Sequence, residues 1–225
     1  MTICVIPARG GSKGIPRKNI VQVAGKPLVA WSIEQALAAE KVDKVIVTTD
    51  DDEIDHIARS HGADTFRRQP ITATDTAPSE MAIAEVLEHH TGHDVCVFLQ
   101  ATSPIRQPGD IDACVEQVEH YGDSLFSYRK VEGYTWSQSG KLTPCYTVRE
   151  PRQYWHAETL EENGSIYVFR TAGFMQHQNR LFGKVLGYEM HPLDSFQIDE
   201  PQDVQLLEQL LYTRLPHDCR IAAAN

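Results

Sequence analysis

The sequence has little cysteine, few aromatic residues and a deficit of positive charge. Its 225 residues include five cysteines, and Phe, Trp and Tyr together make up 8%. The cysteines are scattered, odd in number and form no Cys-x-x-Cys pair. This spacing favours reduced thiols over disulfides or a zinc site. Two of them, Cys4 and Cys96, fall in segments predicted to be buried strands.

Long apolar stretches are also missing. No segment approaches the roughly 20 apolar residues of a membrane span, and Met1 runs directly into an apolar segment, which leaves no room for a signal peptide. Lys and Arg number 21 against 31 Asp and Glu, giving a formal net charge of -10. An acidic balance argues against nucleic acid as a partner. We therefore predict a cytoplasmic protein with neither a membrane nor a nucleic-acid partner.

Apolar runs alternate with amphipathic segments, a pattern typical of βαβ units around a mostly parallel sheet. The predicted strands are Thr2–Ala8, Lys44–Thr48, Asp94–Gln100 and Ser124–Tyr128. The predicted helices are Pro27–Ala39, Asp52–His61, Ser79–His89, Gly109–His120 and Pro201–Tyr212. The length fits one α/β domain with an appendage. We predict a three-layer α/β domain over residues 1–215 and a disordered tail at 216–225.

The alternation stops between Arg129 and about Gly164, where polar and aromatic residues mix without a period. An insertion of this length without secondary structure is unusual inside a compact domain. Aromatic side chains such as Trp136 and Trp155 are typical anchors of an interface. Residues 129–163 are therefore predicted to project as an arm that packs against another surface.

The most informative segment is the loop after the first strand, which reads Pro-Ala-Arg-Gly-Gly-Ser-Lys-Gly-Ile-Pro-Arg-Lys-Asn at positions 7–19. Glycines let backbone N–H groups approach an anion, and the cations add charge. The carboxyl end of a parallel strand is where an α/β sheet binds its ligand. The loop matches neither the Walker pattern nor the dinucleotide fingerprint. A solvated basic turn is the alternative to a triphosphate site.

Three cations of this loop, Arg9, Lys13 and Lys18, are the natural partners of a triphosphate. Asn19 supplies a polar group for the ribose or a phosphate. For Arg17 a purely solvated side chain is an equal alternative.

Positions 6–19 resemble the signature of the acylneuraminate cytidylyltransferases, which make CMP-sialic acids, and the resemblance extends over essentially residues 2–212. It implies a Rossmann-like nucleotidyltransferase fold and a homodimer formed through the protruding arm. The implied reaction transfers CMP from CTP to the anomeric hydroxyl of a nine-carbon 2-keto acid sugar and releases pyrophosphate. In that family the positions that match Arg9, Lys18 and Asn19 contact CTP.

Two further segments resemble the family on the nucleotide side. Arg68 matches a family arginine, and Ala77 and Ser79 would line a cytosine pocket that is too small for a purine. Ser79 also stands where a helix N-cap is expected. The segment 99–106 resembles the family's Leu-Gln-Pro-Thr-Ser-Pro-Leu-Arg, which implies that Gln100 lies near the nucleotide and the acceptor sugar.

The clearest departure from the family is at Gln197-Ile198-Asp199, where most members have Asp-Ile-Asp. The resemblance implies Mg²⁺, which prefers oxygen ligands, with Asp199 as its ligand and as a catalytic residue beside Arg9, Lys18 and Gln100. Gln197 either holds the metal or its water through its carbonyl oxygen or contacts the sugar. Asp199 has an alternative role as the cap of a helix that starts at Pro201.

On the acceptor side, the resemblance assigns Arg152 to the sugar carboxylate, Tyr167 to a hydrogen bond with the sugar and Phe182 to its N-acyl group. Packing in the core or at a dimer interface is the alternative for each. Two other functions stay open. One is transfer to a different 2-keto sugar acid, such as legionaminate, pseudaminate, deaminated neuraminate or a Kdo-type sugar. The other is a catalytically silent nucleotide-binding homologue.

Overall fold

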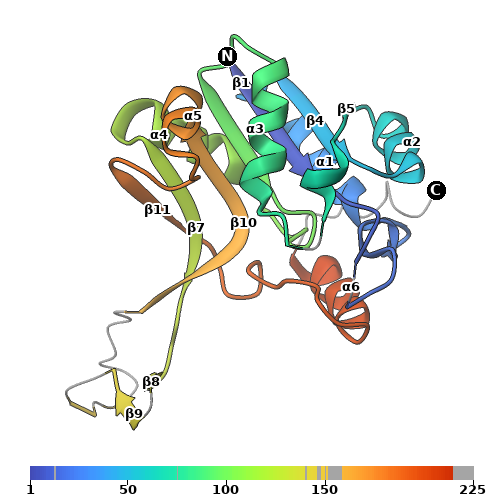
Figure 1. Cartoon of the computed structure of the whole chain (residues 1–225). Coiled ribbons are helices and arrows are strands. Elements are labelled where there is room, and N and C mark those ends of the chain that lie inside the picture. Colours follow the sequence, from blue (N-terminus) through green and yellow to red (C-terminus); the bar gives the residue numbers. More distant parts are fainter. Residues whose placement is uncertain are drawn as a thin grey trace.

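The computed structural model describes residues 1–12, 14–74, 76–139, 141–145, 148–149, 151 and 159–214. The predictions for Lys13, Arg152, Trp155 and the tail at 216–225 fall outside these residues. Seven strands form the central sheet in the order β11-β7-β10-β6-β1-β4-β5 (Figure 1). Their bounds are β1 Thr2–Pro7, β4 Lys44–Thr49, β5 Asp64–Arg67, β6 Val95–Leu99, β7 Ser124–Lys130, β10 Leu160–Arg170 and β11 Val185–Glu189.

The sheet is mostly parallel, as the sequence predicts. Only β10 among these seven strands runs against its neighbours, β6 and β7. The central strand β1 pairs with β4 on one side and β6 on the other, and its residues Ile3 to Ile6 are fully buried. A strand covered on both faces reads as a continuous apolar run. The loops that follow β1, β4 and β6 therefore meet at one edge of the sheet.

Six helices are described: α1 Leu28–Ala38, α2 Asp52–Ser60, α3 Ser79–His89, α4 Asp110–Tyr121, α5 Thr171–His177 and α6 Asp203–Arg214. Apolar side chains of α1, α2 and α4 pack on one face of the sheet, and those of α3 and α5 pack on the other. The result is the predicted three-layer arrangement. A third apolar cluster joins α6 to Val23 and Trp31, and thereby holds the chain near Ile198 against the domain.

Beyond the sheet, β7 and β10 continue as a two-stranded ribbon that carries a hairpin of β8 (Trp136–Ser139) and β9 (Lys141–Pro144) away from the α/β body (Figure 1). The sequence analysis predicted a projecting arm over residues 129–163 but assigned no strand to it, whereas Arg129 pairs with Glu161 across the ribbon. Alternating polar side chains on an exposed ribbon give no apolar signal for a strand.

Four elements of the sheet and its cover were not predicted: β5, β10, β11 and α5. β5 and β11 are edge strands with half-exposed residues, and α5 is only seven residues long, so their apolar patterns are weak. The predicted helices lie within two residues of the observed ones. Within the described part of the chain, none of the helices combines the length and apolar character that crossing a bilayer requires.

Candidate functional site

A pocket of about 400 Å³ lies at the carboxyl ends of β1 and β6. Its lining brings together seven of the predicted site residues, which come from separate parts of the chain: Arg9, Lys18, Asn19, Arg68, Ala77, Ser79 and Gln100. Three of them are cations, and polar atoms dominate the surface. The pocket therefore has the composition that an anionic, hydrogen-bonding ligand requires.

The glycine-rich loop forms one wall of this pocket and is held by close backbone approaches. The N–H of Gly10 donates to Asp50 Oδ1 over 2.9 Å. A Cβ added to Gly10 would lie 2.5 Å from Asp51 Oδ2, and one added to Gly14 would collide with the backbone oxygen of Asp199. These two positions have no room for a side chain, which explains the glycines independently of any ligand.

Lys18 and Asn19 follow the loop in a short 3-10 helix, η1 (Lys18–Ile20). Lys18 Nζ donates to Asp199 Oδ1 over 2.9 Å and to the carbonyl of Ile198 over 3.0 Å. Asn19 is buried, and its Nδ2 donates to the carbonyl of Arg9 over 2.9 Å. Asn19 thus fixes the shape of the loop, while Lys18 holds a carboxylate at the rim of the pocket.

Arg68 lies in the opposite wall and is almost fully buried without a direct carboxylate partner among its hydrogen bonds. Its guanidinium donates to the carbonyls of Thr48 and Thr72, and its Nε has no partner in the described structure. Burial lowers the pKa of Arg68, against the attraction of Asp50 and Glu85. A buried cation with an unsatisfied donor favours an anion in the pocket beside it.

The N-cap role expected for Ser79 is wrong. The N-cap of α3 is Pro78, and Ser79 is the first residue of the helix. Pro78 has extended backbone, with φ of -64° and ψ of 149°, and the helix begins at Ser79, the first residue of the predicted helix. The Ser79 hydroxyl at the pocket wall is therefore not used as a cap.

Gln100 directly follows β6 and is supported by Arg106. The Arg106 guanidinium donates to the carbonyls of Gln100 and Ser165, each within 3.0 Å, and also to side chains of α1. Burial lowers the pKa of Arg106 to about 10. This arginine ties the end of β6 to β10 and fixes the backbone that carries Gln100.

A bulge in β10, between Glu162 and Tyr167, brings Gln197 next to Gln100. Gln197 Nε2 donates to the carbonyl of Asn163 over 2.6 Å. A Cβ added to Gly164 would lie 2.6 Å from Gln197 Nε2 and 2.7 Å from Gln100 Oε1. Two side-chain amides thus converge on a glycine at the pocket edge.

The expected capping role of Asp199 is also wrong. The helix α6 begins at Asp203, whose own Oδ2 accepts from the N–H groups of Asp199 and Glu200 over 2.8 Å. The Asp199 side chain faces Lys18 instead and is 68% exposed. Among the described residues, no group of three or more His, Cys, Asp or Glu side chains is placed to hold a metal ion.

The two described residues that were predicted to contact the acceptor, Tyr167 and Phe182, lie in different parts of the structure. Tyr167 is buried and stacks on the pocket residue Phe98 at 5.3 Å between ring centroids. Its hydroxyl donates to Glu162 Oε2 over 2.9 Å, and burial, with Glu162, raises the pKa of Tyr167 to about 12. It therefore lies directly behind the pocket wall. Its placement is compatible with a supporting role.

Phe182 lies elsewhere. Its backbone exchanges hydrogen bonds with the Ser124 hydroxyl at the start of β7, and its ring packs against His177. β7 runs in the same direction as β6, because both are antiparallel to β10. The start of β7 therefore lies at the end of the sheet opposite the pocket, which is at the carboxyl end of β6. This placement is against a contact with an acceptor in the pocket, so Phe182 is omitted from the proposed site.

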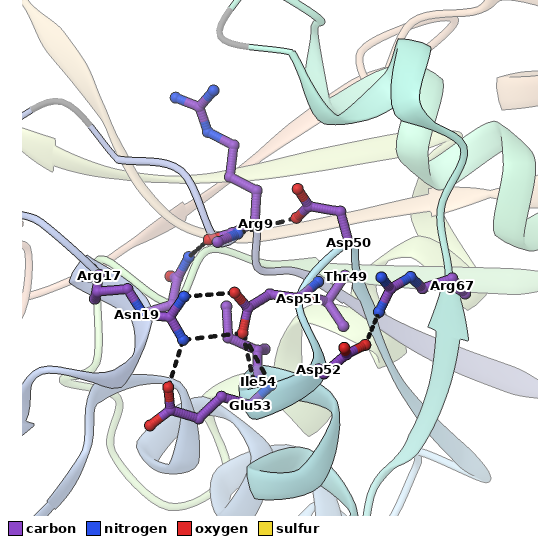
Figure 2. Close-up of polar contacts among 11 residues, drawn as sticks. Arg9, Arg17, Asn19, Thr49, Asp50, Asp51, Asp52, Glu53, Ile54 and Arg67 are labelled. Atoms are coloured by element: carbon purple, nitrogen blue, oxygen red, sulfur yellow. Dashed lines mark hydrogen bonds and ion pairs between the residues drawn. The ribbon is translucent and has the colours of Figure 1, made fainter.

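The sequence reasoning missed the acidic run after β4. Asp50 and Asp51 contact the glycine-rich loop, and Arg17 bridges Asp51 and Glu53 (Figure 2). The signal was available, because these carboxylates directly follow an apolar strand at the ligand-binding edge of the sheet. The interpretation of Arg17 as a purely solvated side chain is wrong, because Arg17 forms these ion pairs.

Comparisons with known proteins agree with this geometry. A family model described as Cytidylyltransferase matches residues 3–220. The N-acylneuraminate cytidylyltransferase of Oncorhynchus mykiss is 36% identical over 216 residues, which cover 91% of this chain and 49% of that protein. The enzyme of that name from Escherichia coli O18:K1:H7 is 34% identical over 220 residues, 91% of this chain and 50% of that protein. The chain spans about half the length of these relatives.

A third relative, the pseudaminic acid cytidylyltransferase of Campylobacter jejuni, is 36% identical over 173 residues, 74% of this chain and 66% of that protein. Among solved structures, CMP:2-keto-3-deoxy-manno-octonic acid synthetase complexed with CTP shares the fold with a TM-score of 0.71 at 19% identity, covering 94% of this chain and 98% of that one. The sequence match and the shared fold agree, and the chain belongs to the cytidylyltransferase family.

Proposed function

We propose that this chain is an N-acylneuraminate cytidylyltransferase-type enzyme that transfers CMP from CTP to the anomeric hydroxyl of a nine-carbon 2-keto acid sugar. The observation that carries the proposal is the convergence of Arg9, Lys18, Arg68 and Gln100 on one pocket. Relatives that are 34% and 36% identical over 91% of the chain bear names for this activity. The proposal includes a homodimer that works in the cytoplasm.

In the proposed reaction, the acceptor hydroxyl oxygen forms a bond to the α-phosphorus of CTP. The bond from that phosphorus to the oxygen bridging to the β-phosphate breaks, pyrophosphate leaves, and the hydroxyl proton passes to solvent. The chain supplies positioning and charge. Arg9, Lys18 and Arg68 face the negative charge of the triphosphate, and Gln100 orients the acceptor beside it. Lys18 uses two of its three donors on Asp199 and Ile198, which leaves the third for this contact.

Among the described residues, no cluster of carboxylates could hold Mg²⁺ without further ligands. The site therefore fits Mg²⁺ only if oxygens of the triphosphate supply most of the ligands of the cation. Asp199 would hold the cation, as one carboxylate with substrate phosphates is a common arrangement for Mg²⁺. When bound, Mg²⁺ supplies positive charge to the triphosphate. The Gln197 amide nitrogen donates to the Asn163 carbonyl, so only the Gln197 carbonyl oxygen would face the cation, and it would bring no charge.

A second acceptor class is supported by one comparison. The 36% identity to a pseudaminic acid cytidylyltransferase over 173 residues is as high as that to the sialic acid enzymes. Together with Gln197 in place of the family's Asp, this makes another nine-carbon 2-keto sugar acid the alternative acceptor.

The test is pyrophosphate release from CTP and Mg²⁺ across a panel of 2-keto sugar acids, with N-acetylneuraminate, legionaminate, pseudaminate, deaminated neuraminate and Kdo. We expect turnover with a nine-carbon acid. CTP should also raise the melting temperature by linkage, whereas ATP and GTP should do much less. Equal stabilisation by ATP, together with no turnover on any acid, would replace the proposal with a general nucleotide binder.

A further inference from the structure

Arg17 has an unusual backbone for a residue with a side chain. Its φ of 57° and ψ of 33° place it in the left-handed region, directly before Lys18 and Asn19. A Cβ makes this conformation unfavourable. Such a conformation persists only where surrounding contacts hold it in place. The contacts of the Arg17 side chain can supply this stabilisation.

Those contacts are made with the first turn of α2 (Figure 2). Arg17 Nη1 donates to Asp51 Oδ2 over 2.5 Å, and Nη2 donates to Asp51 Oδ1 over 3.0 Å and to Glu53 Oε2 over 2.6 Å. This is a fork-to-fork pair, the strongest geometry for an arginine and a carboxylate. An exposed ion pair is usually weak, but bidentate geometry within a network is the exception.

Asp51 is itself held firmly. It is the N-cap of α2, and its Oδ1 accepts from the N–H groups of Glu53 and Ile54 over 3.0 Å each. Helix α2 is anchored to the core by the buried Ile54 and Ala58. Through Asp51, the Arg17 side chain is therefore bound to a helix end that is itself anchored to the core.

Two neighbouring carboxylates, Asp50 and Asp51, also contact the other end of the loop. Gly10 donates to Asp50, and the Gly10 Cα approaches Asp51 too closely to carry a Cβ. The loop from Gly10 to Arg17 is thus closed across Asp50 and Asp51. The next residue, Lys18, binds Asp199 instead.

We propose that Arg17 is a positioning residue for the nucleotide: its pair with Asp51 and Glu53 fixes the backbone from which Lys18 and Asn19 reach into the pocket. The inference rests on the proposed function, because the ligand concerned is CTP. Without the pair, the backbone at 17 is free to leave the left-handed region. Lys18 and Asn19 then have to be ordered when CTP binds, and that ordering weakens binding.

The experiment measures CTP binding by calorimetry and the KM for CTP and kcat by pyrophosphate release, with Mg²⁺ present. The variants are Arg17→Ala, Asp51→Asn and the double variant. Asn caps helices as well as Asp does, so Asp51→Asn removes the charge and keeps α2. We expect each single variant to weaken CTP binding about 10-fold with kcat within about 2-fold, and the double variant to be no worse than either single one.

Two further variants separate positioning from general charge or stability. Arg67→Ala breaks the pair between Arg67 of β5 and Asp52 of α2, which does not involve the loop (Figure 2); CTP binding should be unchanged. Arg17→Lys keeps the charge without the fork, and should recover only part of the affinity. Circular dichroism verifies that each variant is folded, and Asp51→Asn with Arg17→Lys decides the matter if Arg17→Ala does not fold.

CTP affinity within about 2-fold of wild type in both single variants would overturn the role of Arg17 while leaving the proposed function intact. An equal loss in Arg67→Ala, or additive losses in the double variant, would do the same. No CTP binding by the wild-type protein in the same titration would instead remove the proposed function, and the positioning role with it.

Discussion

At the scale of single residues, the opposed side chains of Lys18 and Asp199 decide how the pocket is charged before a nucleotide arrives. Their 2.9 Å ion pair joins residues 181 positions apart. Lys18 lines the pocket and only a small part of its side chain is exposed, whereas Asp199 lies largely in solvent. A triphosphate at this position would compete with the Asp199 carboxylate for the ammonium group, and Asp199 would be more available to a cation.

Replacing Lys18 with Ala is therefore expected to lower turnover by at least about 100-fold, the scale lost with one preorganised electrostatic donor. Folding should be little changed, since Lys18 is not a member of the apolar core. Lys41→Ala, which breaks an exposed pair with Glu119 far from the pocket, is the matched control. Circular dichroism and a pyrophosphate assay provide the measurement. Near-normal turnover of a folded Lys18→Ala protein would contradict the triphosphate role.

At the scale of elements, the bulge in β10 contributes more to the site than the regular part of the strand, because Gln100 and Gln197 lie against it. Asn163 Oδ1 accepts from the Ser127 hydroxyl over 2.6 Å, and its Nδ2 donates to Ser195 Oγ over 2.9 Å. Through these bonds the bulge joins β7 to the segment that carries Gln197. Gly164, with φ of 66°, sits at its turn against both glutamine amides.

Gly164→Ala is predicted to act in two ways that a control can separate. The left-handed backbone costs a residue with a Cβ about 1–2 kcal/mol, and the new methyl group would also displace Gln100. Gly92→Ala has the same kind of backbone, with φ of 88°, but no atom within 4 Å of its Cβ. Urea unfolding should show a loss in both variants, and turnover should fall at least about 10-fold only in Gly164→Ala. Equal activity in the two variants would contradict this role of the bulge.

At the scale of the whole molecule, the arm exposes apolar side chains that do not pack against the α/β domain. Its hairpin exposes Trp136 and Leu142, which are 51% and 61% accessible. Large apolar side chains on a thin ribbon bury little against their own chain. They have the character of anchors for a second surface.

We expect the protein to sediment as a homodimer at micromolar concentration, most simply with two-fold symmetry. Replacing Trp136 and Leu142 together by Glu should shift the equilibrium toward the monomer, because two charges would be placed in the interface. Replacing the exposed Tyr121, which lies on α4 outside the arm, should leave the dimer intact. A wild-type monomer at that concentration would contradict the predicted dimer.

The amino-acid sequence by itself determined the parts of this protein that depend on local pattern. The apolar run of β1 and the stripes of α1 and α3 predicted buried elements within two residues of their observed bounds, since periodicity reports which face is buried. The glycine-rich loop could be placed at the ligand edge because a parallel strand precedes it. The strands β10 and β11 were not predicted, because β10 begins with exposed polar residues and the edge strand β11 is half-exposed, so neither is an apolar run along its whole length as β1 is.

Only the tertiary structure decided which distant residues meet. The sequence offers no reason to pair Arg17 with Asp51, or Lys18 with Asp199, because an ion pair depends on distance in space and not on separation along the chain. The same reason applies to Phe182: the family resemblance suggested a contact with the acceptor, but the direction of β7 places Phe182 at the end of the sheet opposite the pocket.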